Sequence, residues 1–171
     1  DIELNENGRK AAGLLGEKLD GIDFDVIYSS PLIRAYETAC LIRGHKSIPI
    51  IRDPRLVEIS FGQGEGDSWA AWNEKTSPYN SFISDTANYL PPEGGETFEH
   101  IIARTKDFAV NELEKHSDII KRTMIVAHGA LLSALLCYLE NHGKENFWGN
   151  GLLSNCQAVV YEYKDGIWRK K

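Results

Sequence analysis

Apolar residues along this chain fall into short segments whose spacing alternates between the period of a helix and the period of a strand. In residues 6–19, Ala12, Leu15 and Leu19 share one helical face, and Asn5 is a suitable N-cap. Short β-rich runs separate such segments. The first third of the chain is therefore predicted to form a helix over 6–19, a strand over 24–28, a helix from Pro31 to about Gly44 and a strand over 49–52.

A glycine-rich loop over residues 62–66 begins the middle part of the chain. A short helix is predicted around residues 68–75, and an irregular stretch rich in proline and glycine over 76–96. Thr97 is a suitable cap for a long helix that runs to about residue 116. The predicted buried face of that helix consists of Phe98, Ile101, Ile102, Thr105, Phe108 and Ala109.

The alternation of strands and helices predicts an α/β fold with three layers, α/β/α, in which helices flank a mostly parallel central sheet. We expect a single domain over residues 1–171, with a small helical and loop insertion at about 62–96. The last predicted elements are a strand over 123–127, an apolar helix after His128-Gly129, and a hairpin of residues 156–163 and 167–170 around Asp165-Gly166.

The composition is that of an ordinary globular domain. Of 171 residues, 42% are hydrophobic and 26% charged, and no apolar run approaches the ~18 residues of a membrane span. Nineteen Lys and Arg against 25 Asp and Glu give a net charge of −6, which disfavours nucleic-acid binding. No signal or transit segment is recognisable, and Cys40, Cys137 and Cys156 form no close pair, so we expect a reducing compartment, the cytoplasm.

Polar residues directly after a predicted strand are candidates for a site, because α/β sheets bind ligands at the carboxyl ends of their strands. Arg34 lies in the first turn of the helix that follows strand 24–28. A helix N-terminus disfavours a cation unless an anion is bound as well, and the arginine fork can hold phosphate oxygens. From spacing alone, a side chain that extends into solvent or pairs with Glu37 is an equally good interpretation of Arg34.

Two further residues are candidates on position. His128 ends the predicted strand over 123–127, and Gly129 lets a ligand approach the backbone closely. A lone histidine is more often buried against a carbonyl group, but the strand-end position favours a role in phosphoryl transfer. Glu58 precedes the glycine-rich loop and could hold a proton as a general acid near a cleft. Taken alone, Glu58 would be interpreted as a surface residue.

The spacing of the residues excludes several other phosphate-binding and metal-binding motifs. Gly143-Lys144 lacks the glycine pattern of a P-loop, and no cysteine has an arginine six residues later. Asp23 and Asp25 begin a predicted strand, whereas the residues of an aspartyl-phosphate motif should follow one. The five histidines show no zinc-ligand spacing, so no metal site is predicted.

Taken together, several segments resemble the histidine phosphatase superfamily, which has the phosphoglycerate-mutase-like fold. Each segment is weak alone, but their order along nearly the whole chain is highly specific. They are Leu4-Asn5-Glu6-Asn7-Gly8-Arg9, SPLIRAYETA from Ser30 to Ala39, LVEISFG from Leu56 to Gly62, PEGGET from Pro92 to Thr97, VAHG from Val126 to Gly129, and Asn155-Cys156.

The resemblance implies a mechanism. A histidine of the family attacks phosphorus in line and becomes phosphohistidine, a glutamic acid protonates the leaving alcohol, and water hydrolyses the intermediate. Carried over to this chain, Glu58 is the general acid, and Arg34 and His128 bind the phosphoryl group with Gly129. Since protein cations can supply the charge stabilisation, no cofactor or metal is implied.

Two departures from the family pattern matter. Gly64 stands where Phe-Gly-x-Trp-Glu-Gly has its tryptophan, which predicts a looser loop. The Arg-His-Gly motif with the nucleophile, which in the family ends the first strand, is missing, and the chain begins at Asp1. We expect the natural protein to carry it on an upstream strand of ~5–6 residues inside the sheet. Otherwise the chain is a non-catalytic phosphate binder or an unstable fragment.

The resemblance favours hydrolysis of a small phosphorylated metabolite, because the stretch between Glu58 and Gly94 is as short as in the small broad-specificity and α-ribazole-type phosphatases. Mutase-type transfer and a phosphate-binding pseudo-enzyme are the alternatives, and a dimer is one possible assembly. Further substrate contacts are expected from Phe61, Gln63 and Asn155. Five aromatic residues of the variable region form either a lid over the leaving group or a local core: Trp69, Trp72, Tyr79, Phe82 and Tyr89.

Overall fold

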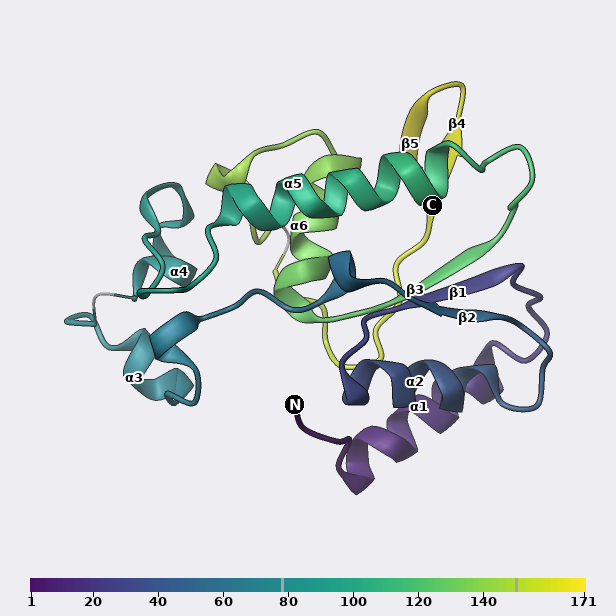
Figure 1. Cartoon of the computed structure of the whole chain (residues 1–171), viewed down its shortest axis with the longest axis horizontal. Helices are drawn as coiled ribbons and strands as arrows, with labels where there is room; N and C mark the ends of the chain where they lie inside the picture. Colours follow the sequence, from purple (N-terminus) through teal and green to yellow (C-terminus); the bar gives the residue numbers. More distant parts are fainter. Residues whose placement is uncertain (78, 150) are drawn as a thin grey trace.

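A parallel sheet lies at the centre of the computed structural model, which describes residues 1–77, 79–149 and 151–171 (Figure 1). In register, Ile27 lies opposite both Ile50 and Met124. The middle strand is buried at every position because both of its faces are covered, as is typical of parallel sheets. Hydrogen bonds join the strands in the order β2 (Ile50–Arg52), β1 (Val26–Ser29), β3 (Thr123–Val126).

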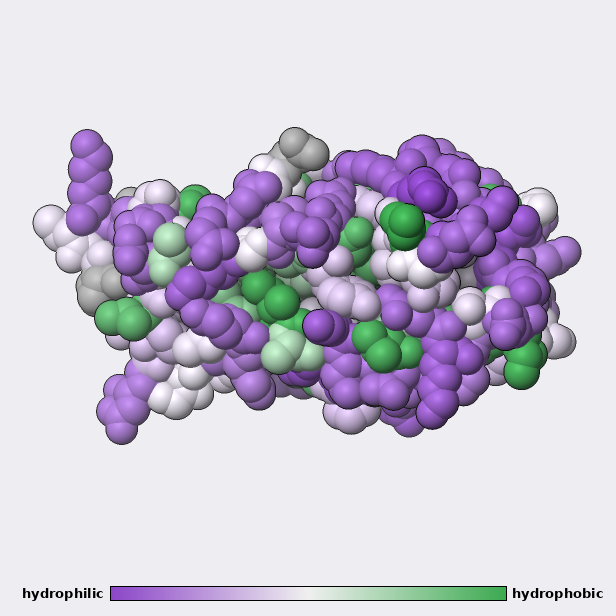
Figure 2. All heavy atoms as spheres, turned by 90° about the horizontal axis from the view of Figure 1, so that it is seen from above, coloured by the Kyte–Doolittle hydropathy of each residue, from purple (hydrophilic) through white to green (hydrophobic). Residues whose placement is uncertain are grey.

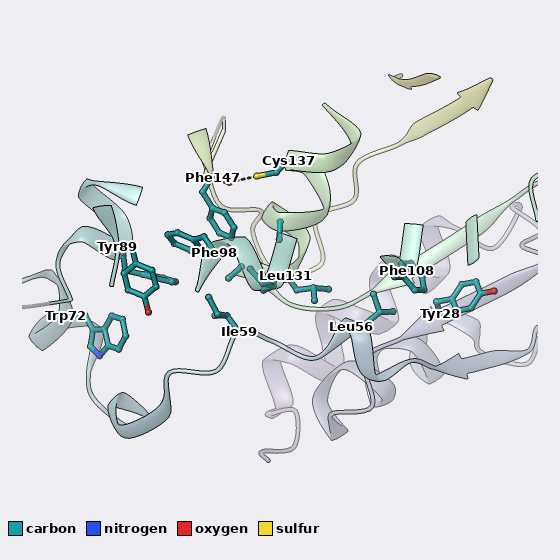
Figure 3. Packing of buried hydrophobic residues seen from close by; sticks show 14 of the residues in the cluster. Tyr28, Leu56, Ile59, Trp72, Tyr89, Phe98, Phe108, Leu131, Cys137 and Phe147 are labelled. Atoms are coloured by element: carbon teal, nitrogen blue, oxygen red, sulfur yellow. Dashed lines mark hydrogen bonds between the residues drawn. The ribbon is translucent and has the colours of Figure 1, made fainter. Parts of the chain in front are cut away.

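Helices cover both faces of this sheet, which confirms the predicted three-layer α/β architecture (Figure 1). Alternate residues of β1 point into two cores. Ile27 packs with Ala39 and Ile42 on one face, whereas Tyr28 belongs to the larger cluster on the other (Figure 3). The helices are α1 (Glu6–Lys18) and α2 (Ile33–Arg43) on the first face, and α5 (Phe98–Phe108) and α6 (Gly129–Leu139) on the second.

Helix caps follow the sequence closely, with one exception. The side chains of Asn5 and Thr97 accept hydrogen bonds from the first turns of α1 and α5, and α2 ends at Gly44, as predicted. The predicted start of α2 is wrong: Leu32 is the N-cap, so Pro31 precedes the helix instead of occupying its first position. Arg34 remains in the first turn.

The long helix predicted to residue 116 changes its winding at Ala109. Residues Ala109–Glu114 form a π-helical segment, which a 3.6-residue period does not reveal. This segment brings the Glu112 carboxylate to 2.6 Å from Arg55 Nη2. Arg55 also binds Asp53 and Asp107. The cluster ties the end of α5 to the turn Pro54–Leu56, and these carboxylates hold the pKa of Arg55 well above its usual value.

The region 62–96 contains more regular structure than predicted, since α4 (Ser81–Ser84) follows α3 (Trp69–Asn73). Trp72, Phe82 and Tyr89 are at most 4% exposed and make edge-to-face contacts in the larger cluster (Figure 3). For these aromatic residues the local-core interpretation is therefore right and the lid interpretation wrong. Tyr79 is partly buried against the same cluster, and the side chain of Trp69 lies outside the described residues.

The chain ends in the predicted hairpin, which forms a separate antiparallel sheet. Asp165 and Gly166 both have positive φ, as a two-residue hairpin turn requires. The first strand begins later than predicted, because Asn155-Cys156 form a turn. The strands are β4 (Tyr161–Lys164) and β5 (Ile167–Lys170).

Hydrophilic side chains cover most of the face seen in Figure 2, where hydrophobic residues form small separate areas. Within the described ranges of the chain, no helix is both long and apolar enough to cross a membrane.

Candidate active site

The Glu58 carboxyl group lies at the N-terminus of α6. Its Oε1 accepts hydrogen bonds from Leu131 N (3.0 Å) and from Ile59 N (2.9 Å), and its Oε2 accepts one from Ala130 N (3.3 Å). These contacts join the segment after the turn Pro54–Leu56 to the helix that follows His128. Glu58 is therefore a fixed group of the strand-end region and not a free surface side chain.

Burial raises the pKa of Glu58 above its usual value, although the backbone N–H donors and the positive charge of Arg34 act in the opposite direction. Desolvation of the carboxylate thus outweighs its hydrogen bonds. A carboxyl group with a raised pKa can carry a proton closer to neutral pH, which is what a general acid requires.

His128 lies at the other side of this helix start, where β3 ends. Its Nε2 is 2.8 Å from Ser30 Oγ, and both residues are buried. Its partner is thus a hydroxyl group from the end of β1, not the carbonyl of the ordinary buried histidine. Burial, with the charges of Arg34 and Arg104, lowers the pKa of His128 to about 4, so the imidazole is neutral at pH 7.

Arg34 and the N-terminus of α2 hold a carboxylate in this structure. Asp1 Oδ2 accepts a hydrogen bond from Ile33 N at 2.8 Å, and Asp1 Oδ1 is 3.7 Å from Arg34 Nη1. The predicted alternative partner Glu37 instead pairs with Arg9. Arg34 is thus paired with a carboxylate of the chain itself, and a role of Arg34 in phosphate binding stays a prediction.

The three catalytic candidates therefore converge. The charge of Arg34 acts on both Glu58 and His128, and both of these residues lie at the start of α6. Gly129 is the first residue of that helix, where a Cβ atom would come within 3.1 Å of Leu152 Cδ2. The chain is thus packed closely around the predicted phosphate-binding glycine.

The three residues predicted to contact substrate are placed differently. Phe61 packs edge-to-face on Trp72 and Phe82, so its ring belongs to the aromatic cluster. Gln63 is exposed and donates from Nε2 to Glu93 Oε2 at 3.0 Å. Asn155 is exposed in the turn before the hairpin. A substrate contact by any of them stays a prediction.

Sequence reasoning missed two residues of this site. Ser30 was part of a recognised motif, but its bond to His128 joins positions 98 apart in the sequence. Arg104 was not singled out, although it lies beside the predicted buried face of α5, next to Thr105. An arginine bordering an apolar face was the signal that could have found it.

The loop after Phe61 is tightly packed at Gly62 and Gly64, whereas Gln63, Glu65 and Gly66 are exposed, so the looser loop predicted from Gly64 is not seen at that position itself. At Gly62, φ is +53° and a Cβ atom would lie 2.2 Å from Glu93 O, so only glycine fits. At the buried Gly64, a Cβ atom would lie 2.8 Å from Trp72 Cζ2 and 3.0 Å from Pro92 Cγ. The side chain of Trp72 thus lies where a side chain at position 64 would begin.

Gly64→Ala is expected to lower the free energy of unfolding by about 1–3 kcal/mol, because the added methyl group overpacks this space. Urea unfolding of the variant and the wild type measures the difference. Gly13→Ala in α1 is the matched control, since nothing lies within 4 Å of an added Cβ there; its stability should change by less than about 1 kcal/mol, and in the stabilising direction. A Gly64→Ala protein as stable as the wild type would contradict this packing.

In the part of the chain that the structure describes, no group of three or more His, Cys, Asp or Glu side chains is arranged to hold a metal ion. Arg34 and Arg104 bring positive charge close to His128. The arrangement therefore combines an arginine that can bind an anion (Arg34), a neutral imidazole (His128) and a carboxyl group that can be protonated (Glu58).

Comparison with known proteins points to one family. The sequence model of the histidine phosphatase superfamily (branch 1) matches residues 1–171. Phosphoserine phosphatase 1 of Hydrogenobacter thermophilus is 29% identical over 162 residues, which are 94% of this chain and 75% of that protein. A 2,3-bisphosphoglycerate-dependent phosphoglycerate mutase of Bradyrhizobium diazoefficiens is 34% identical over 154 residues, 85% of this chain and 72% of that protein.

Solved structures give the same fold. Bacillus stearothermophilus YhfR superimposes with a TM-score of 0.89 at 28% sequence identity, over 99% of this chain and 83% of that chain. Because the similar proteins include one named as a hydrolase and one named as a mutase, the choice between these reactions depends on the site.

Proposed function

The chain belongs to the histidine phosphatase superfamily (branch 1), and on that premise we propose that it hydrolyses phosphomonoesters of small metabolites through a phosphohistidine intermediate. One observation carries the proposal: Glu58 and His128 lie together at the start of α6, where the charge of Arg34, from the first turn of α2, acts on both. We expect the activity in a reducing compartment, the cytoplasm, since the cysteines described are free thiols.

Arg34 and the N-terminus of α2 bind the oxygens of the phosphoryl group in this proposal, which displaces the Asp1 carboxylate from both. Ser30 holds His128, and the imidazole hydrogen-bonds to the transferring group. Phosphoryl transfer depends mainly on positioning and on stabilisation of charge, so fixed donors around a cation suit this reaction.

Glu58 then acts as the acid. As the bond from phosphorus to the ester oxygen breaks, the protonated Glu58 carboxyl gives its proton to that oxygen, and the alcohol leaves neutral. The resulting carboxylate accepts a proton from the water that attacks the phosphohistidine, which releases inorganic phosphate and restores both groups. The nucleophile is the histidine of the Arg-His-Gly segment that we expect before Asp1.

The experiment uses the full-length gene product, whose intact mass shows whether it carries that segment. We expect turnover of 4-nitrophenyl phosphate, no loss of rate with EDTA, and a phosphoenzyme of mass +80 Da after rapid quenching. The positive charge from Arg34 makes a metal ion unnecessary. A rate abolished by EDTA and restored by a divalent cation would point to a metal phosphatase. Tight phosphate binding without turnover would identify a pseudo-enzyme.

Mutase-type transfer is the second candidate, favoured by the identity to the Bradyrhizobium mutase. The described chain places a compact aromatic core between Glu58 and Gly94, with only the short helices α3 and α4 in that stretch. Assays with 3-phosphoglycerate, with and without 2,3-bisphosphoglycerate, separate the two reactions. Isomerisation faster than release of inorganic phosphate would replace hydrolysis as the main activity.

A further inference from the structure

Arg104 of α5 joins the two ends of the segment that carries Glu58. Its Nη1 donates to the main-chain oxygen of Arg55 at 2.6 Å, and its Nη2 lies 3.4 Å from the main-chain oxygen of Glu58. The guanidinium thus spans the stretch between the turn Pro54–Leu56 and the candidate acid. Its side chain is only 16% exposed, so solvent competes weakly for these contacts.

Glu96 fixes the guanidinium from the opposite side. Arg104 Nε is 2.7 Å from Glu96 Oε1, and Arg104 Nη2 is 2.9 Å from Glu96 Oε2, which is a two-bond fork. The Glu96 side chain is 9% exposed, and its main-chain N–H donates to Ser60 O at 2.8 Å. The pair therefore holds the Glu58 segment on both sides of the residue, at Arg55 and at Ser60.

These contacts of Arg104 and Glu96 matter because the Glu58 carboxyl group can act as the acid in only one position. Its oxygens must reach the N–H groups of Ala130 and Leu131 and also face the leaving group. Displacing a catalytic group by about 1 Å can cost about 100-fold in rate. Main-chain contacts that fix the residue's backbone are a direct way to prevent such displacement.

We propose that the Arg104–Glu96 pair is the positioning element of the general acid, which sets Glu58 against the N-terminus of α6. The inference rests on the proposed function, because it assigns the pair to the step in which Glu58 protonates the leaving oxygen. Arg104 and Glu96 are positioning residues: they act through Glu58 and do not touch the reacting atoms.

Leaving-group dependence separates this role from a general structural one. A poor leaving group, such as the alcohol of an alkyl phosphate, needs the proton, whereas 4-nitrophenolate leaves with little help. Arg104→Gln and Glu96→Gln should lower kcat on an alkyl phosphate by about 10- to 100-fold and kcat on 4-nitrophenyl phosphate by less than about 3-fold. Arg104→Lys should also lower kcat on the alkyl phosphate, because lysine keeps the positive charge but cannot form the two-bond fork.

Lys144→Gln is the matched control, since it removes a different ion pair to α5, the one with Glu99. It should leave the ratio of the two rates unchanged. Equal losses on both esters in the Arg104 and Glu96 variants, or a changed ratio in Lys144→Gln, would overturn the positioning role.

The amide NMR resonances of Ala130 and Leu131 test the same inference without any turnover. Both N–H groups donate to Glu58, so Arg104→Gln and Glu96→Gln should shift their resonances in the direction caused by Glu58→Gln, and the control Lys144→Gln should not. Unshifted resonances in the Arg104 and Glu96 variants would overturn the inference. Shifts in a protein inactive on every ester would uphold the positioning role and reject the proposed function.

Discussion

Glu58→Gln is expected to slow hydrolysis of an alkyl phosphate by about 10²–10⁴-fold, because glutamine has the shape of glutamic acid but its amide cannot act as an acid. Its amide oxygen can still accept from Leu131 N, so the start of α6 should keep its structure. Steady-state kinetics on alkyl and 4-nitrophenyl phosphates measure the loss, which should be much smaller for the nitrophenyl ester.

The pH dependence of kcat also tests Glu58 as the general acid. Burial raises the pKa of Glu58, and the residue works as an acid only when protonated. The rate constant kcat on the alkyl ester should therefore fall as pH rises through this raised pKa, and this limb of the profile should vanish in Glu58→Gln. An unchanged profile in the variant would assign the proton to another group.

Arg34→Ala should reduce turnover on an aryl phosphate at least tenfold, with a raised KM, because the variant loses both the charge and the fork that hold phosphate oxygens. Arg34→Lys keeps the charge and should recover only part of the rate. Phosphatase assays across substrate concentration separate kcat from KM.

Arg9→Ala is the matched control for this experiment. Arg9 is an arginine on α1 that pairs with Glu37 and Glu3, and 44% of its side chain is exposed. Its removal should leave kcat and KM within about twofold of the wild type, since surface ion pairs contribute little to structure. Loss of activity in Arg9→Ala alone, with Arg34→Ala fully active, would move the phosphate site away from α2.

Much of the fold could be predicted because its signals are local. The apolar runs before Ser30 and His128 became β1 and β3, and side chains of Asn5 and Thr97 cap helices where the sequence placed them. The position of polar residues after buried strands selected Arg34 and His128 without any structure. Glu58 needed the family resemblance, since a glutamate after an irregular segment has no pattern of its own.

The remainder depends on contacts between distant segments. Nothing near Gly64 in the sequence shows that Trp72 fills its space. The π-helical winding at Ala109 goes with a carboxylate–arginine cluster that includes Arg55, more than fifty positions earlier. The fork between Arg104 and Glu96 joins residues eight positions apart, but its target carbonyl at Glu58 is 46 positions away. Local periodicity carries no information on such partners.

The parallel pairing of β1 with β3 also has a kinetic consequence. Ser30 and His128 meet across 98 positions, so a large loop must close before either contributes to the site. Folds dominated by such long-range pairings acquire their native contacts slowly, and local helices form well before them. In a refolding experiment the circular dichroism signal of the helices should thus return early. Arg34 and Glu58 should reach their final positions only when the sheet closes.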